Sequence, residues 1–166
     1  ILGFVRSSTA VFAILFALGY FLFGTAWAWS SAIGSSPDDD YHLASAWCPP
    51  PLDSSGCTIG FDPSTGRRTV EVPAELTVAS CYRFESDQSA ACQASAVPGT
   101  LASTYRVDDG DYPGPYYRFL HLFVGPDIDH SVLVMRTVNV AIAALVYGAA
   151  LMLVPDRQRR IVVTTV

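Results

Sequence analysis

The sequence has no lysine and few charged residues of any kind. All ten basic residues are arginines, against fifteen acids, and charged residues make up 15% of the 166 residues. Soluble domains contain about 25% charged residues, so a wholly soluble protein is not expected. The pI of about 4.9 argues against nucleic acid as a partner, because binding to phosphates requires a basic surface.

Two long apolar segments account for the mean hydropathy of +0.33. Residues 10–33 contain no charged residue, and a helix of that length rises about 36 Å, enough to cross a hydrocarbon core of about 30 Å. Residues 131–154 contain one basic residue, Arg136, near their start. We therefore predict transmembrane helices at 10–33 and 131–154, with the lipid bilayer as a partner. A cleaved signal peptide is the alternative for the first segment, since Ala26-Trp27-Ala28 has the A-x-A form.

The charges outside the two segments predict the orientation. One arginine precedes the first segment and three follow the second, whereas residues 37–130 contain five arginines against fourteen acids. Basic residues favour the cytoplasmic side of a membrane. We therefore expect a multi-pass protein of the cell membrane. Residues 1–9 and 155–166 are then cytoplasmic, and the loop 34–130 is extracytoplasmic.

All four cysteines lie in this acidic loop, at Cys48, Cys57, Cys81 and Cys92. Their spacing lacks the C-x-x-C pairs of a structural zinc site, so no metal site is predicted there. An even number of cysteines in an oxidising compartment predicts two disulfides. Three pairings are open, and the sequential one, Cys48–Cys57 with Cys81–Cys92, is favoured because it closes two short loops.

The fold class predicted from these features is a mainly α-helical membrane protein. Two transmembrane helices flank a disulfide-stapled extracytoplasmic loop with short helices at 38–47 and 116–124. Alternating β-branched residues predict a small β-hairpin formed by 69–72 and 76–82. Prolines at 49–51 should end the first short helix, because proline cannot continue a helix.

The densest polar cluster is Asp38-Asp39-Asp40 with His42, directly after the first apolar segment. One interpretation is structural: Ser36 caps a helix, Pro37 is its first residue and Asp39 completes a capping box. The other is functional, because crowded carboxylates raise the pKa of at least one of them, as suits a general base. A divalent cation held by carboxylate oxygens is a further alternative, although no cofactor is predicted with certainty.

The residues Pro37-Asp38-Asp39-Asp40-Tyr41-His42 resemble the P-D-E-P-x-H signature of the bacterial membrane family called domain of unknown function 2142. Pro113-Gly114-Pro115-Tyr116-Tyr117 resembles the P-P-x-Y-Y element that this family has before its second helix, and Arg136 matches an arginine that opens that helix. Asp40 stands where the family has proline. The loop between Cys48 and Cys92 has no counterpart that can be placed.

The resemblance implies a GT-C-like fold, as in polytopic glycosyltransferases that use polyprenyl-phosphate sugars, with this chain as the N-terminal part. It implies that Asp38 or Asp39 is the catalytic base, with His42 beside it. Arg136, Tyr116 and Tyr117 would then bind the substrate, a polyprenyl-phosphate sugar donor and a glycan acceptor. Arg136 at a helix mouth also has a simpler interpretation, in which it only reaches the membrane surface.

A non-enzymatic role is the alternative. A membrane-anchored subunit or sensor with an acidic, disulfide-bonded loop would bind a protein partner or a cation outside the cell. Asp108, Asp109 and Asp111 form a second acidic cluster that fits this alternative. They lack the spaced D-x-D-x-D-G pattern of an EF-hand loop.

Overall fold

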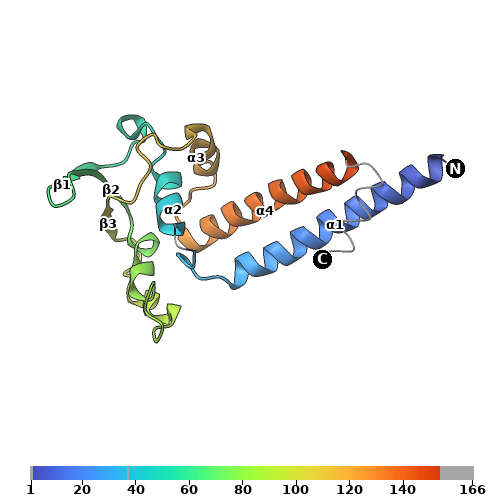
Figure 1. Cartoon of the computed structure of the whole chain (residues 1–166). Helices are drawn as coiled ribbons and strands as arrows, with labels where there is room; N and C mark the ends of the chain where they lie inside the picture. Colours follow the sequence, from blue (N-terminus) through green and yellow to red (C-terminus); the bar gives the residue numbers. More distant parts are fainter. Residues whose placement is uncertain (1, 37, 154–166) are drawn as a thin grey trace. The chain divides into compact units, whose positions relative to one another are not determined.

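The computed structural model describes residues 2–36 and 38–153. The expected roles of Pro37 and of the basic segment 155–166 lie outside the described residues. The chain divides into two compact units. The first contains α1 (Leu2–Ser30) and α4 (Ile128–Leu153) from Arg136 onward, and the second contains Ser31–Met135 (Figure 1).

Two helices in the described part of the chain are long and apolar enough to cross a membrane. The apolar spans are Thr9–Ser30, within α1, and Ile128–Leu153, the whole of α4. Most of their large apolar side chains are exposed, among them Leu15, Phe23 and Leu145. Such side chains gain nothing from contact with water, and a lipid environment accounts for their exposure.

Small residues mark the contact between the helices of the first unit. A Cβ added at Gly24 of α1 would lie 2.7 Å from Cγ1 of Val140, and one added at Gly148 of α4 would lie 3.0 Å from Cβ of Ala17. Because residues further along α1 meet residues earlier in α4, the two helices are antiparallel. Close approach at glycine is the usual way in which helices pack in lipid.

The second unit combines short helices with a small sheet. Its helices are α2 (Asp39–Trp47) and α3 (Gly114–His121), and its antiparallel sheet has the order β1-β2-β3. The strands are β1 (Ile59–Asp62), β2 (Arg67–Pro73) and β3 (Leu101–Thr104). Four 3₁₀ helices complete the unit, at Leu52–Ser54, Ala74–Leu76, Val78–Cys81 and Ala90–Ser95.

The predicted β-hairpin has the correct strand at 69–72 but the wrong partner strand. β2 contains the expected segment 69–72, but it pairs with β1 and β3, and residues 76–82 form 3₁₀ turns. The strand ends at Pro73, after which the backbone N–H and the hydroxyl of Thr77 both donate to the carbonyl of Ala74. The actual hairpin turn is Asp62-Pro63-Ser64-Thr65-Gly66, whose aspartate accepts hydrogen bonds from Ser64 and Thr65. This is a turn composition that the sequence displays.

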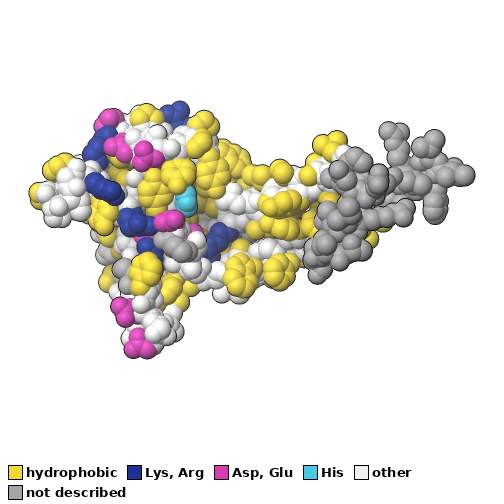
Figure 2. Space-filling model, in the orientation of Figure 1, with side chains coloured by type: hydrophobic (Ala, Val, Ile, Leu, Met, Phe, Trp, Pro, Cys, Tyr) yellow, Lys and Arg dark blue, Asp and Glu magenta, His cyan; other side chains and the backbone are white. Residues whose placement is uncertain are grey.

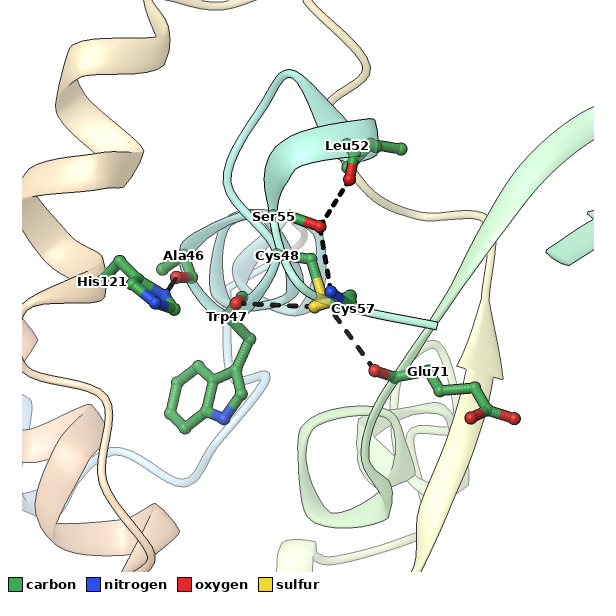
Figure 3. The surroundings of a disulfide bond; sticks show 8 residues. All are labelled: Ala46, Trp47, Cys48, Leu52, Ser55, Cys57, Glu71 and His121. Atoms are coloured by element: carbon green, nitrogen blue, oxygen red, sulfur yellow. Dashed lines mark hydrogen bonds between the residues drawn. A yellow bond between two sulfur atoms is a disulfide. The ribbon is translucent and has the colours of Figure 1, made fainter. Parts of the chain in front are cut away.

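The core of the second unit lies where α2, the sheet and the first 3₁₀ turns meet. It is built from wholly buried apolar side chains, including Leu52, Val70, Val72 and Leu76. Two disulfides are present, Cys48–Cys57 and Cys81–Cys92, which confirms the sequential pairing. Figure 3 shows Cys48–Cys57 between the end of α2 and the turn at Leu52–Ser55. This disulfide therefore ties α2 to the core.

Candidate functional site

The acidic cluster lies at the N-terminus of α2, but it is not capped as predicted. The helix begins at Asp39, with Asp38 rather than Ser36 in the N-cap position, and the Asp38 side chain makes no capping hydrogen bond. Instead, Asp39 accepts a hydrogen bond of 2.7 Å from the backbone N–H of Gly34. The carboxylates of Asp38 and Asp40 pair with Arg106.

Asp40 is held between two arginines. Nε of Arg106 lies 2.7 Å from Oδ2 of Asp40, and Arg83 pairs with Oδ1. Burial, the largest single influence, raises the pKa of Asp40, but the hydrogen bonds and charges of Arg83 and Arg106 together keep this pKa below its usual range. Asp40 is therefore ionised and serves to fix the structure.

Asp38 is the more available carboxylate. Its Oδ1 lies 3.0 Å from Nη2 of Arg106, yet the side chain is 70% exposed, against 13% for Asp40. An exposed carboxylate held by one guanidinium can still accept a proton or a hydrogen bond from a ligand. Of the three neighbouring acids, Asp38 is the one that is exposed.

His42 faces the second tyrosine of the Tyr116–Tyr117 pair. Its Nδ1 lies 2.8 Å from the hydroxyl of Tyr117, and the two rings are stacked with centroids 6.1 Å apart. Tyr117 is wholly buried. Burial, followed by the charge of Asp108, raises the pKa of Tyr117 to about 12, so the hydroxyl keeps its proton. This contact orients the imidazole through one nitrogen.

Asp108 organises the loop beside α2. It is wholly buried, and its Oδ1 accepts hydrogen bonds from the hydroxyl of Tyr41 at 3.2 Å and from the backbone N–H groups of Asp111 and Tyr112 at 2.8 and 3.1 Å. Burial, together with the Asp108 carboxylate, raises the pKa of Tyr41. Asp108 therefore holds α2 and residues 109–112 in fixed positions.

The alternative cation cluster at Asp108, Asp109 and Asp111 is not assembled. Asp108 points into the protein, whereas Asp109 lies 3.1 Å from Nη1 of Arg68. Within residues 2–36 and 38–153, no group of three or more His, Cys, Asp or Glu side chains is arranged to hold a metal ion.

An open pocket of about 630 Å³ lies against the exposed side of this network. Figure 2 shows acidic and basic side chains interleaved on the face of the second unit that it draws. Aspartates, arginines and tyrosines predominate in the lining, with His42 beside Asp38: Asp38, Tyr41, His42, Arg67, Arg68, Tyr105, Arg106, Asp109, Asp111 and Tyr112. Carboxylates, guanidinium groups and aromatic rings around one cavity suit a ligand with many hydroxyl groups.

The pocket unites some of the predicted site residues and not others. Asp38 and His42 line it, and Tyr117 contacts His42 from outside the lining. Asp39 instead accepts a hydrogen bond from Gly34, and Tyr116 lies on the exposed side of α3. Arg136 belongs to the first unit, where its Nη1 donates to the carbonyl of Ala28 at 3.2 Å.

Arg83 and Arg106 were missed as site residues, and Asp108 was named only as part of the alternative cation cluster and not for its contact with α2. Each arginine is a single residue in a polar stretch, and no local pattern links it to Asp40, which is more than 40 positions away in the sequence. The Asp-Gly-Asp turn at 109–111 is the one signal that could have drawn attention to Asp108, because aspartate at the start of a turn binds the backbone that follows it.

Comparison with known proteins identifies a protein family that this chain matches. A family described as "Predicted membrane protein (DUF2142)" matches residues 21–166. No curated protein and no solved structure matches the chain. The family match covers most of the sequence and confirms the resemblance drawn from the Pro37–His42 and Pro113–Tyr117 motifs. The chain therefore belongs to the DUF2142 family of predicted membrane proteins.

Proposed function

We propose that this chain forms the N-terminal part of a polytopic, GT-C-type membrane glycosyltransferase. It would transfer a sugar from a polyprenyl-phosphate donor to a glycan of the cell envelope or another extracytoplasmic acceptor. The observation that carries the proposal is the pocket beside α2, where Asp38 and His42 line one cavity with arginines and tyrosines. Two disulfides in the same unit support an extracytoplasmic location.

Asp38 is the proposed base. Its carboxylate would take the proton from an acceptor hydroxyl while that oxygen attacks the anomeric carbon of the donor sugar. The bond between the anomeric carbon and the phosphate oxygen then breaks, and its electron pair leaves with the polyprenyl phosphate. Asp39 and Asp40 are poorer candidates, since Gly34 and the two arginines already occupy their oxygens.

The departing phosphate needs cationic partners, because negative charge develops on its oxygens. His42 is a proposed partner, and Arg67 and Arg106 line the same pocket. Arg136, the other partner that the family resemblance implies, belongs to the first unit. Arginine suits this role because its planar guanidinium matches phosphate oxygens in a bidentate way. Two of the three tyrosines that line the pocket, Tyr105 and Tyr112, offer flat apolar faces to a sugar ring.

The test is Asp38→Asn in the full-length protein in membranes, assayed with individual polyprenyl-phosphate sugars. We expect transfer to fall by at least about a hundredfold, the usual contribution of a general base, with unchanged protein level. Asp87→Asn is the matched control, because Asp87 is also an exposed aspartate of this unit but does not line the pocket. Equal activity of the two variants would remove Asp38 from the mechanism.

A binding subunit or sensor is the second candidate function. The second unit has its own core and two disulfides, so it can present a binding pocket without any catalytic step. This candidate is favoured if the unmodified protein transfers sugar from none of the donors but binds a saccharide or a protein partner, and if Asp38→Asn weakens that binding.

A further inference from the structure

Helix α3 exposes a row of apolar side chains. Tyr116, Phe119 and Leu122 follow one another at a spacing of three residues, so they share one side of the helix. All three are exposed, and Leu122, immediately after the helix, is 76% exposed. Figure 2 shows hydrophobic side chains gathered over the region of α3. An exposed apolar row of this kind usually marks a surface that another phase or molecule covers.

The opposite side of α3 is fixed to the second unit. Tyr117 and Leu120 are buried, and Leu120 shares the core with Val132 and Met135 of α4. Two side chains also contact backbone carbonyls near the end of α2: Nε of Arg118 donates to Pro50, and Nδ1 of His121 lies 2.9 Å from the oxygen of Ala46. The direction in which the apolar row faces is therefore set by the fold.

The surface of α3 carries no negative charge. Residues 114–126 contain no acid, although residues 37–130 as a whole contain fourteen. Arg118, four residues before Leu122, is exposed beside the apolar row. An apolar strip flanked by basic groups is the pattern of helices that lie in the interface of a membrane with anionic lipids.

The chain keeps α3 close to the start of an apolar span. Only residues 122–127 separate α3 from α4, and six residues reach at most about 20 Å. Hydrogen bonds shorten this connection further, because Gly125 N–H donates to the hydroxyl of Ser131 and that hydroxyl donates to the carbonyl of Asp127. Along the chain, α3 therefore lies within a few residues of the apolar span that begins at Ile128.

We propose that α3 is an interfacial helix, whose row Tyr116, Phe119 and Leu122 inserts into the headgroup region of the bilayer. The occupant of this face is lipid, with anionic headgroups near Arg118. This proposal does not rest on a transferase activity. It assigns α3 a second anchoring surface, in addition to the apolar spans of α1 and α4.

The test uses nitroxide labels on the full chain in vesicles of phosphatidylcholine and phosphatidylglycerol. All four native cysteines are in disulfides, so Leu122→Cys or Phe119→Cys adds one free thiol for labelling. Phe61→Cys and Phe84→Cys are matched controls, since both are exposed aromatic residues on other parts of the unit. Each label is then exposed to oxygen, which is soluble in lipid, and to a water-soluble nickel chelate.

We expect the ratio of oxygen to nickel accessibility to be several-fold higher at 119 and 122 than at 61 and 84. A ratio equal to that of the controls would place α3 in water and overturn the proposal. Low accessibility to both reagents at 119 and 122 would also overturn it, because a protein surface would then cover the face. Because both labelled positions are exposed, the labels should leave the core intact, and unchanged native disulfides check this.

Discussion

The two units of the chain place their apolar side chains in opposite ways. In the second unit, Leu52 and Leu76 are wholly buried among the other members of the core. In the first unit, Leu15 of α1 and Leu145 of α4 are largely exposed, and the helices approach each other closely at Gly24 and Gly148. Leucine side chains are therefore part of the core in the second unit but lie on the outer surface of the helices in the first.

The difference shows that the two units are built for different solvents. Burial of apolar surface stabilises the second unit, because the alternative for those side chains is water. Lipid removes that driving force from the first unit, so its helices rely on close packing and internal backbone hydrogen bonds. Disulfides and buried ion pairs occur in the second unit, where they hold short elements together. The predictions below test this contrast.

The largest effect is expected from truncating a buried leucine. Leu52→Ala should lower the free energy of unfolding of the second unit by about 2–5 kcal/mol, because it leaves a cavity in the core. Leu145→Ala, at a position that is 72% exposed, should change stability by about 0.5 kcal/mol or less. Thermal unfolding in lipid nanodiscs would measure both. Similar losses for the two variants would mean that the exposed face of α4 is packed against protein.

Loss of one disulfide should have the next largest effect on stability. Cys48→Ala with Cys57→Ala should destabilise the second unit by about 3 kcal/mol, because a loop of this length is no longer closed in the unfolded state. The far-ultraviolet signal of α1 and α4 should persist while near-ultraviolet signals of the second unit melt at lower temperature. Loss of both signals at the same temperature would show that the two units unfold together.

Removal of the partly buried carboxylate of Asp40 should cost about 2 kcal/mol. Asp40→Asn leaves Arg83 and Arg106 without their shared partner, whereas Asp38→Asn removes an exposed ion pair worth less than about 1 kcal/mol. Chemical denaturation of the two variants would measure the difference. Equal losses would show that Arg106 depends on both carboxylates alike.

The same carboxylate predicts a pH dependence. The pKa of Asp40 is lower in the folded protein than its ordinary value of 3.8. Its contribution to stability is therefore fully present above that ordinary value and is lost as the pH falls through the lower, folded pKa. Unfolding measured between neutral pH and strong acid should show less loss of stability in Asp40→Asn than in the unmodified protein at the acidic end.

An effect of similar size is expected at the helix contact of the first unit. Gly24→Leu should destabilise the packing of α1 against α4 by about 1–3 kcal/mol, the usual cost of overpacking, because its Cβ would approach Val140. Gly19→Leu is the matched control, since an added Cβ there meets no described atom within 4 Å. Crosslinking between α1 and α4 in membranes would report the change. Equal crosslinking in both variants would show that Gly24 is not a packing position.

Features that depend on composition over a long stretch could be predicted from the sequence. Two apolar segments, an acidic loop, two sequential disulfides and a helix that starts near Asp38 all follow from runs of one residue type or from short loop closures. The exact helix start and the partner of β2 could not be predicted from the same patterns. Both depend on competition: Asp38 binds Arg106 in preference to its own helix, and the turn at 62–66 brings β1, rather than residues 76–82, against β2.

The candidate site shows the same division. The sequence by itself determined that Asp38, Asp39, Asp40 and His42 lie on one turn, because they are neighbours along the chain. Only the tertiary structure decided that ionised Asp40 pairs with two arginines, that Asp39 accepts a hydrogen bond from the backbone and that Asp38 lines a pocket. The physical reason is that Arg83, Arg106 and Asp108 reach α2 from positions that are distant in sequence. Electrostatic pairing depends on distances in space that no local pattern records.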